Sequence, residues 1–354
     1  MPELPEVESV RRGLERHLAG RTIAGVQVFH PRPLRRQSGG PDAFARAVSG
    51  RTMTGAVRRG KLLWLPLDDG RALAAHLGMS GQLLVRGTRP PADGERARRR
   101  APLGADAEQP GTRVEGRGTP LRPGAPGGPE DAPGAPAPER DPWPRPPHLR
   151  VRLHLEPDDA DAPDGAALDF VDQRMFGGLH VVDLIPTDDG APGGLGSPQA
   201  LLPADATHIA RDLLDPDLDG TKTIARIRAS RRPIKTLLLD QGIVSGVGNI
   251  YADEGLWAAS IHGLRPGQAL GPLVTGRLLA STAQVMERAL TAGGTSFDAL
   301  YVNAEGTAGY FARELAAYGR AGRECRRCKT ALRAETIGGR SHVFCPRCQK
   351  RPRR

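Results

Sequence analysis

Hydrophobic residues in the first eighteen positions follow the spacing of an amphipathic helix. Val7, Val10, Leu14 and Leu18 recur at intervals of three or four, and arginines occupy the other faces. The pattern predicts a helix that begins near Pro5, because proline suits a first helical turn and the neighbouring glutamates complement the positive end of the helix dipole. Helix capping alone is enough to explain Pro5 and Glu6.

Five later stretches alternate apolar and polar residues and predict β-strands. They span residues 21–30, 51–67, 71–87, 148–157 and 166–184. Gly, Pro and Asp separate them, which is typical of antiparallel sandwiches and barrels. The first half of the chain is therefore predicted to form an antiparallel β-domain.

Residues 88–147 interrupt this pattern. Fifteen of the thirty-three prolines lie in this segment, with many Gly, Ala and Arg and almost no aliphatic residues. Such a composition buries too little apolar surface to offset the entropy lost on ordering. We interpret residues 88–147 as a disordered insertion between two strands of the first domain.

From about residue 200 the apolar period becomes helical. Helical spacing is found in residues 204–216, 221–241, 249–260 and 271–293. These segments predict a second, mostly helical domain.

A glycine-rich connection, DQGIVSGVGNIYADE, joins two of the predicted helices. It places Asn249 at an expected helix N-cap, where free backbone amides favour an anion such as phosphate. Glycine-rich connections are more often purely structural, but the preceding helical segment carries five basic residues that favour phosphate binding. These are Arg226, Arg228, Arg231, Arg232 and Lys235.

The formal net charge of +10 is concentrated at the end of the chain. Residues 320–354 hold twelve Lys or Arg and two acidic residues, so the rest of the chain is neutral overall. A concentrated basic region is typical of a surface that neutralises phosphates, although residues 350–354 also fit a basic disordered tail. Neither a run of eighteen apolar residues nor a signal peptide is found, so we expect a soluble cytoplasmic protein.

All four cysteines lie near the C-terminus, in CRRCKTALRAETIGGRSHVFCPRC. They form two CxxC pairs, separated by sixteen residues: Cys325 and Cys328, then Cys345 and Cys348. Four thiolates complete a tetrahedral shell, so the spacing predicts one structural zinc with a hairpin between the pairs; an iron–sulfur or redox site is the minor alternative. Arg340 lies near the expected hairpin tip, where contact with nucleic acid and ordinary exposure are equally good interpretations.

Pro2 and Glu3 precede the first helix and are not explained by capping. Once the initiator Met is removed, Pro2 carries a secondary α-amine, and an ordinary α-amino pKa of roughly 7.7–8.0 leaves a useful fraction neutral and nucleophilic. Attack on an aldehyde-like carbon gives a cationic iminium, and Glu3 is placed to donate or accept the accompanying proton. These two residues alone leave catalysis less favoured than capping.

The motifs together resemble those of the formamidopyrimidine-DNA glycosylase family, bifunctional base-excision enzymes for oxidised purines. The resemblance rests on PELPEVE, RRGKLL, HLGMSG, DQRMFGG, GVGNIYADE, GYF and the cysteine hairpin, in this order. It implies an α+β fold with an N-terminal antiparallel β-sandwich domain and its N-terminal helix (1–190), and a helix-two-turn-helix domain (200–300). A lesion loop and zinc-bound β-hairpin (301–349) and a basic tail (350–354) complete the expected organisation.

The resemblance also implies catalytic roles. Pro2 would attack C1′ of the damaged nucleotide and form the Schiff base, Glu3 would transfer protons during base loss and ring opening, and Glu6 would help to orient the site. Lys61 matches a lysine that contacts the lesion phosphate and donates a proton in β-elimination, although alone it also fits a solvated strand-edge lysine. Arg340 matches a hairpin arginine that grips phosphates and is linked to δ-elimination.

Further residues match DNA contacts of the family. Met79, Arg174 and Phe176 match the three residues that fill the gap left by a flipped base, although Met79 and Phe176 would more often be core residues. The residues that match DNA-backbone contacts are His76, His148, Arg231, Lys235 and Asn249. Met175 stands where many relatives have a second arginine, and residues 303–311 match the loop that closes over the flipped base.

The resemblance therefore predicts a monomeric DNA glycosylase with AP-lyase activity, which takes double-stranded DNA with oxidised or abasic sites and needs one structural zinc. One alternative is an endonuclease VIII-like enzyme for oxidised pyrimidines, although relatives of that branch read PEGPE where this chain has Leu4. The other alternative is a non-catalytic, zinc-dependent DNA-binding protein.

Overall fold

A computed structural model describes residues 2–87, 145–158, 165–293 and 314–352. The expected insertion lies outside the described residues except for its last three positions. The expected lesion loop, residues 303–311, and the end of the basic tail also lie outside them.

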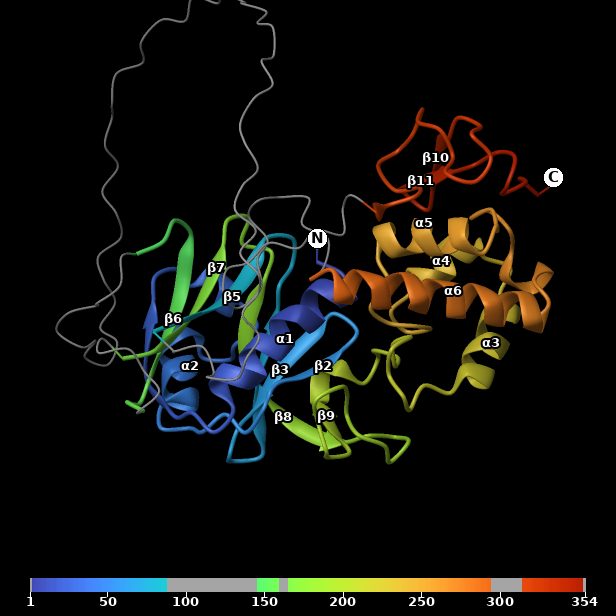
Figure 1. Ribbon diagram of the computed structural model, residues 1–354. Coiled ribbons are helices and arrows are strands. Elements are labelled where there is room, and N and C mark those ends of the chain that lie inside the picture. Colours follow the sequence, from blue (N-terminus) through green and yellow to red (C-terminus); the bar gives the residue numbers. More distant parts are fainter. Residues whose placement is uncertain (1, 88–144, 159–164, 294–313, 353–354) are drawn as a thin grey trace, which may run out of the picture.

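The first helix, α1 (Leu4–Leu18), confirms the prediction from apolar spacing. Its buried face contacts two different cores. Val7, Val10 and Leu14 join the core of the β-sandwich, whereas Leu4 joins the core of the helical part. Helix α1 therefore lies at the junction between the two parts, where the N-terminus is also found (Figure 1).

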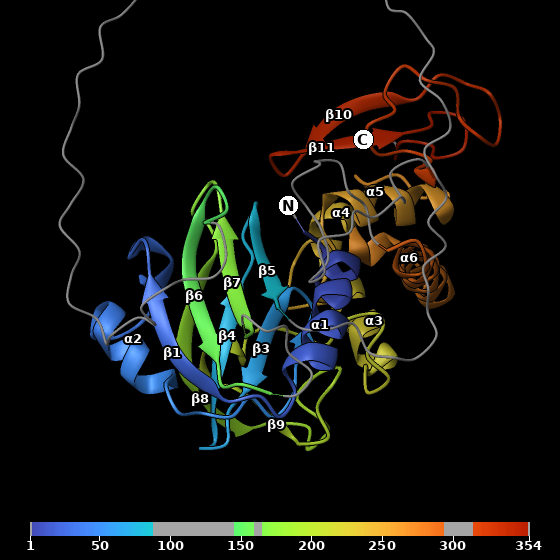
Figure 2. The ribbon, with the colours of Figure 1, turned by 60° about the vertical axis from the view of Figure 1, so that its left-hand side comes forward.

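Two antiparallel sheets form the N-terminal part, as the alternating stretches predict. The four-stranded sheet has the order β1-β6-β7-β5 and the five-stranded sheet the order β2-β3-β4-β8-β9. The strands are β1 (Ile23–Val28), β2 (Val57–Arg59), β3 (Leu62–Pro66), β4 (Arg71–His76), β5 (Gly81–Arg86), β6 (Leu149–Leu155), β7 (Ala167–Asp172), β8 (Gly178–Pro186) and β9 (Leu201–Pro203). The main apolar core contains residues from both sheets, with α1 beside it (Figure 2).

Strands β5 and β6 flank the insertion and lie in the same sheet, separated by β7. A second helix, α2 (Gly40–Val48), was not predicted. Its sequence signals are modest: Pro41 and Asp42 suit a first turn, and Phe44 and Val48 are buried one turn apart.

The helical part contains four α-helices among the described residues. They are α3 (Gly220–Arg228), α4 (Ile234–Leu238), α5 (Asn249–Ala258) and α6 (Pro272–Thr291). The expected helix over 221–241 is divided into α3 and α4, because Pro233 lacks an N–H and disfavours helix in the residue before it. No described helix has both the length and the hydropathy needed to cross a membrane.

The prediction of a helix over residues 204–216 is wrong. Only a short 3-10 helix (Ala204–Ala206) forms there. Asp212 and Asp215 instead accept hydrogen bonds from the amides two residues further on, at 3.1 and 3.0 Å. Such local bonds compete with helix formation, and Pro216 adds to the effect.

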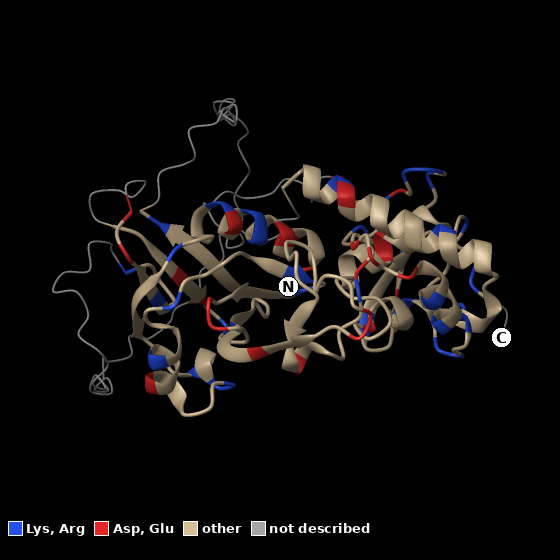
Figure 3. Cartoon of the chain, turned by 90° about the horizontal axis from the view of Figure 1, so that it is seen from below, with Lys and Arg blue, Asp and Glu red and all other residues tan. Residues whose placement is uncertain are grey.

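The C-terminal hairpin consists of β10 (Arg333–Ile337) and β11 (Arg340–Phe344), joined at Gly338 and Gly339. Strand β11 contacts α5, so the hairpin is anchored on the helical part (Figures 1 and 2). Lys and Arg recur along the half of the molecule that ends at the C-terminus, and others lie on the sandwich (Figure 3).

Candidate functional site

The Glu3 carboxylate lies at the N-terminus of α5. Its Oε2 accepts hydrogen bonds from the amides of Gly248 and Tyr251, at 2.8 and 3.2 Å, and its Oε1 accepts one from Ile250 at 2.9 Å. Gly248 is required by close approach, since a Cβ at this position would lie 2.3 Å from Cδ of Glu3. The chain thereby brings residues about 245 positions apart into one buried site.

This arrangement corrects the expected phosphate site. The residue at the N-cap of α5 is Gly248 instead of Asn249, which is the first helical residue. Helix N-termini attract anions because their amides lack intrahelical partners. Here three of the amides are already occupied by the chain's own Glu3.

Burial raises the pKa of Glu3 to about 7. The nearby charge of Lys61 and the hydrogen bonds from α5 oppose this rise, whereas the charge of Glu6 adds to it. A carboxyl group with a pKa near neutrality exchanges protons readily at physiological pH, so Glu3 is suited to act first as an acid and then as a base.

Glu6 connects the start of α1 with α5. Its Oε2 accepts a hydrogen bond from the amide of Glu3 at 2.9 Å, and its Oε1 accepts one from the hydroxyl of Tyr251 at 3.0 Å. Glu6 thus fixes the backbone at Glu3, directly beside the buried Pro2.

Lys61 reaches the same site from the turn between β2 and β3. Its Nζ donates a hydrogen bond of 3.1 Å to the carbonyl of Val247, the residue before Gly248. Burial lowers the pKa of Lys61, while the charges of Glu3 and Glu6 oppose this decrease and the charge of Arg340 adds to it. The predicted residues Glu3 and Arg340 therefore both lie within electrostatic reach of Lys61.

Lys235 is buried within the protein and is not exposed as expected for a phosphate contact. Its side chain is fully buried, and its Nζ donates to Asp253 Oδ1 at 2.7 Å and to the carbonyl of Ser341. Asp253 also contacts the ring of His342 at 2.7 Å and accepts the amide of Val343 at 3.0 Å. Lys235 thus anchors the zinc hairpin on α4 and α5, next to Arg340, and a direct contact with DNA would require it to leave Asp253.

Met79, Arg174 and Phe176 gather on one surface. Met79 is 42% exposed and Phe176 is 50% exposed, which is unusual for large apolar side chains among the described residues. Nη1 of Arg174 lies 4.0 Å from Sδ of Met79. The core interpretation of Met79 and Phe176 is therefore wrong, and we call these three side chains the exposed triad.

Three residues that sequence reasoning missed hold the exposed triad in place. Asp172 is fully buried and accepts hydrogen bonds from Ser80 Oγ at 2.6 Å and the amide of Gly177 at 2.8 Å. The guanidinium of Arg35 donates to the carbonyls of Phe176 and Gly177 at 2.8 and 2.5 Å. Asp172 belongs to the motif DQRMFGG, whereas nothing in the sequence connects Arg35 with it.

His76 and His148 lie beside the exposed triad. His76 ends β4, and its Nδ1 accepts the amide of Gly78 at 3.1 Å. Partial desolvation and the charges of Arg36, Arg35 and Lys61 lower its pKa. The carbonyl of His148 accepts the amide of Asp172 at 3.0 Å. Arg231 is exposed between α3 and α4, and Asn249 lies at the start of α5.

Glu254, a further buried acid of α5, was also missed. Its carboxylate accepts the amides of Ala316, Ala317 and Tyr318 at 2.8 to 2.9 Å. Burial raises the pKa of Glu254 against these hydrogen bonds. Glu254 therefore fixes the chain shortly after the residues that match the lesion loop.

The four cysteines meet as predicted. The sulfur atoms of Cys325, Cys328, Cys345 and Cys348 all lie within 4.8 Å of one another. Four converging thiols supply all four ligands of a closed tetrahedral Zn²⁺ site, which is structural and not catalytic.

Three family models match the chain. They are the formamidopyrimidine-DNA glycosylase N-terminal domain (residues 1–179), the formamidopyrimidine-DNA glycosylase H2TH domain (209–300) and the zinc finger found in FPG and IleRS (322–351). Among curated relatives, the formamidopyrimidine-DNA glycosylase of Nocardioides sp. is 48% identical, over 100% of this chain and 96% of the relative. That of Leifsonia xyli is 44% identical, over 99% of this chain and 100% of the relative.

Solved structures give the same result. Lactococcus lactis Fpg in complex with abasic-site DNA is 25% identical with a TM-score of 0.68, over 99% of this chain and 100% of that one. The same protein with N7-benzyl-Fapy-dG DNA is 25% identical with a TM-score of 0.69, at the same coverage. The chain therefore belongs to the formamidopyrimidine-DNA glycosylase family.

Proposed function

We propose that this protein is a base-excision-repair DNA glycosylase with AP-lyase activity that removes oxidised purines, such as 8-oxoguanine and formamidopyrimidines, from double-stranded DNA. The observation that carries the proposal is the buried Glu3 carboxyl, which follows Pro2 in the chain and is held by three amides at the start of α5. Burial raises its pKa to about 7, and the charge of Lys61 acts on it. The Lactococcus lactis relative has been solved with abasic-site DNA and with N7-benzyl-Fapy-dG DNA, which supports this substrate class.

The chemistry begins at Pro2, after removal of the initiator Met. The free amine of Pro2 attacks C1′ of the damaged nucleotide, the glycosidic bond breaks, and the base leaves with a proton. Glu3 supplies and then accepts protons as the sugar ring opens and the iminium forms. Because Glu6 fixes the backbone at Glu3, it acts as a positioning residue for this step.

Strand cleavage follows from the same intermediate. Loss of a proton from C2′ expels the 3′ phosphate in β-elimination, and a second elimination expels the 5′ phosphate. Lys61 contacts the lesion phosphate and moves protons in the first elimination, while Arg340 holds phosphate for the second. The lowered pKa of Lys61 favours such proton transfer.

The exposed triad of Met79, Arg174 and Phe176 fills the gap that the flipped nucleotide leaves. Unstacking a base costs a few kcal/mol, and inserted apolar side chains offset this cost. His76, His148, Arg231 and Asn249 contact the DNA backbone. Lys235 contributes to DNA binding indirectly, because it anchors the hairpin that presents Arg340 to the DNA.

The zinc held by Cys325, Cys328, Cys345 and Cys348 is structural and stabilises the hairpin that presents Arg340. The protein acts as a monomer on DNA, at the nucleoid, where its substrate is found.

Borohydride trapping tests the proposal directly. The purified protein is incubated with a duplex that contains 8-oxoguanine opposite cytosine, beside Pro2→Gly and a form with an extended N-terminus. A covalent adduct with the native N-terminus is the expected result, and it should be lost in the extended form, because the nitrogen of Pro2 is then an amide and cannot form the iminium. Pro2→Gly keeps a free primary amine in place of the secondary one, so its adduct should be reduced and not abolished.

Two other outcomes would overturn it. An adduct with thymine-glycol duplexes but none with 8-oxoguanine would identify an oxidised-pyrimidine enzyme. Salt-sensitive DNA binding without any adduct would identify a non-catalytic DNA-binding protein.

A further inference from the structure

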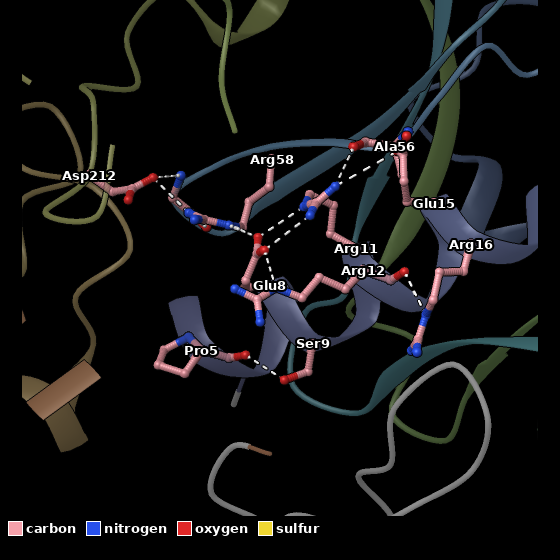
Figure 4. A network of polar contacts seen from close by, with 11 residues as sticks. Pro5, Glu8, Ser9, Arg11, Arg12, Glu15, Arg16, Ala56, Arg58 and Asp212 are labelled. Carbon is pink, nitrogen blue, oxygen red and sulfur yellow. Dashed lines mark hydrogen bonds and ion pairs between the residues drawn. The ribbon is translucent and has the colours of Figure 1, made fainter. Parts of the chain in front are cut away.

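A buried ionic network joins the β-sandwich to the helical part beneath Lys61. Arg58, on β2, is fully buried; its Nε donates to Glu8 Oε2 at 2.9 Å and its Nη1 to Asp212 Oδ2 at 2.7 Å. Glu8 lies on α1, whereas Asp212 lies in the segment that leads into the helical part (Figure 4). One guanidinium thus bridges three parts of the chain.

Asp212 makes a second contact that bears directly on the turn of Lys61. The same oxygen, Oδ2, accepts the amide of Gly60 at 2.9 Å, and Gly60 is the residue immediately before Lys61. Gly60 also contributes its carbonyl to Arg58, at 3.4 Å. The side chain of Asp212 therefore fixes the backbone immediately before Lys61.

The fit of this turn against the helical part is close. Gly60 has φ +59, and a Cβ on it would lie 2.4 Å from Ser245 Oγ and 2.8 Å from the amide of Gly246. Lys61 itself donates to Val247, one residue further along the same loop. The turn and the loop before α5 therefore contact each other at successive residues.

We infer that Asp212 is a positioning residue for Lys61, which fixes the lysine against the loop that also holds Glu3. The inference rests on the proposed function, because it assigns Asp212 to the elimination step in which Lys61 acts. Glu3 is held by the start of α5 and Glu6, independently of Asp212. Loss of Asp212 therefore affects strand cleavage more than base release.

Single-turnover kinetics of Asp212→Ala test this separation. Base release is measured on a duplex with 8-oxoguanine opposite cytosine, and strand cleavage on a duplex with a preformed abasic site, with borohydride trapping on the second. We expect cleavage to slow by roughly 10- to 100-fold, the effect of misplacing a catalytic group by about 1 Å. Base release should stay within about threefold. On the abasic duplex the Schiff base should still form while its elimination is slowed, so more of the adduct should be trapped.

Asp212→Asn is the second variant and guards against a folding defect. The amide side chain is of similar shape and retains an oxygen to accept the Gly60 N–H, although it loses the charge that pairs with Arg58. Its cleavage rate should lie between those of the wild type and Asp212→Ala. A cleavage rate equal to that of Asp212→Ala would contradict the role of the Gly60 contact.

Asp169→Ala provides the matched control. Asp169 is also fully buried and pairs with a fully buried arginine, Arg152, at 2.6 Å, but it lies within the four-stranded sheet. Asp169→Ala should leave the ratio of strand cleavage to base release unchanged. The inference is overturned if Asp212→Ala changes this ratio no more than Asp169→Ala does. Absence of trapping by the wild type would instead overturn the proposed function itself.

Discussion

Two lysines of this chain, Lys235 and Lys61, differ in their burial and in what their ammonium groups contact. Lys61 and Lys235 both have lowered pKa values, in each case because burial disfavours the charged ammonium. Lys235 donates to the carboxylate of Asp253 at 2.7 Å and is fully buried. Lys61 donates to a backbone carbonyl and is only partly buried, and its charge interacts with that of Glu3.

The proposed function gives a physical reason for this difference between the two lysines. A charge with a hydrogen-bonded counterion in the interior is held in place, and removal of either partner is costly. A lysine that transfers protons must instead be able to leave its contact and reach a substrate. Under the proposed function, the same residue type therefore serves as an anchor at α4 and as a proton-transfer group at the β2–β3 turn.

The largest expected effect tests the anchor. Lys235→Ala should lower the free energy of unfolding by about 3–5 kcal/mol, because it leaves Asp253 buried without its ammonium partner. Chemical denaturation measures this change. Lys222→Ala, which removes an exposed lysine from α3, is the control and should change stability by less than about 0.5 kcal/mol.

Combining Lys235→Met with Asp253→Asn should recover part of the lost stability, since no unpaired charge then remains. If Lys235→Ala were as stable as Lys222→Ala, the ion pair with Asp253 would not anchor the fold, and Lys235 would not differ from Lys61 in this respect.

The sequence predicted local features of this architecture better than distant contacts. Apolar spacing located α1 and the strands, and cysteine spacing located the metal site, because both depend on neighbouring residues. The helix expected over 204–216 failed because aspartate side chains there bond the local backbone. Family motifs identified Glu3 and Lys61 individually.

No local pattern shows that Glu3 occupies the amides of α5, because the two segments are far apart in the sequence. The same limit hid the burial of Lys235, whose partner Asp253 lies on another helix, and the pairing of Arg58 with Asp212. The exposure of Met79 and Phe176 depends on two loops that meet only in the folded chain.

The second-largest expected effect is a pH dependence of stability that arises from Glu3. The pKa of Glu3 is about 7 in the folded protein and near 4.5 when unfolded, so folding favours its protonated form. This stabilisation is complete below pH 4.5 and is lost as the pH rises through 7. The difference in unfolding free energy between the wild type and Glu3→Gln should therefore fall by up to about 3 kcal/mol over this window.

Denaturation curves of both proteins at several pH values measure that difference. A difference that stays constant from pH 4 to pH 8 would show that Glu3 titrates normally, and the account of its role as acid and base would then lose its basis.

The smallest expected effect in free energy tests the reactive lysine. Lys61→Ala should slow cleavage of a preformed abasic site by about 100-fold, or about 2.7 kcal/mol in activation free energy, as expected for loss of a general acid–base group. Its unfolding free energy should change by less than about 1 kcal/mol, because no buried carboxylate loses a hydrogen-bonded partner. Lys235→Ala should show the opposite pattern, with a large loss of stability and a smaller change in cleavage per folded molecule.

The two variants thus define a crossed comparison, which requires single-turnover cleavage and denaturation of both proteins under the same conditions. If Lys61→Ala destabilised the fold as strongly as Lys235→Ala while cleaving normally, Lys61 would be a second anchor, and the proton transfers of elimination would have to be assigned to another group at the start of α5.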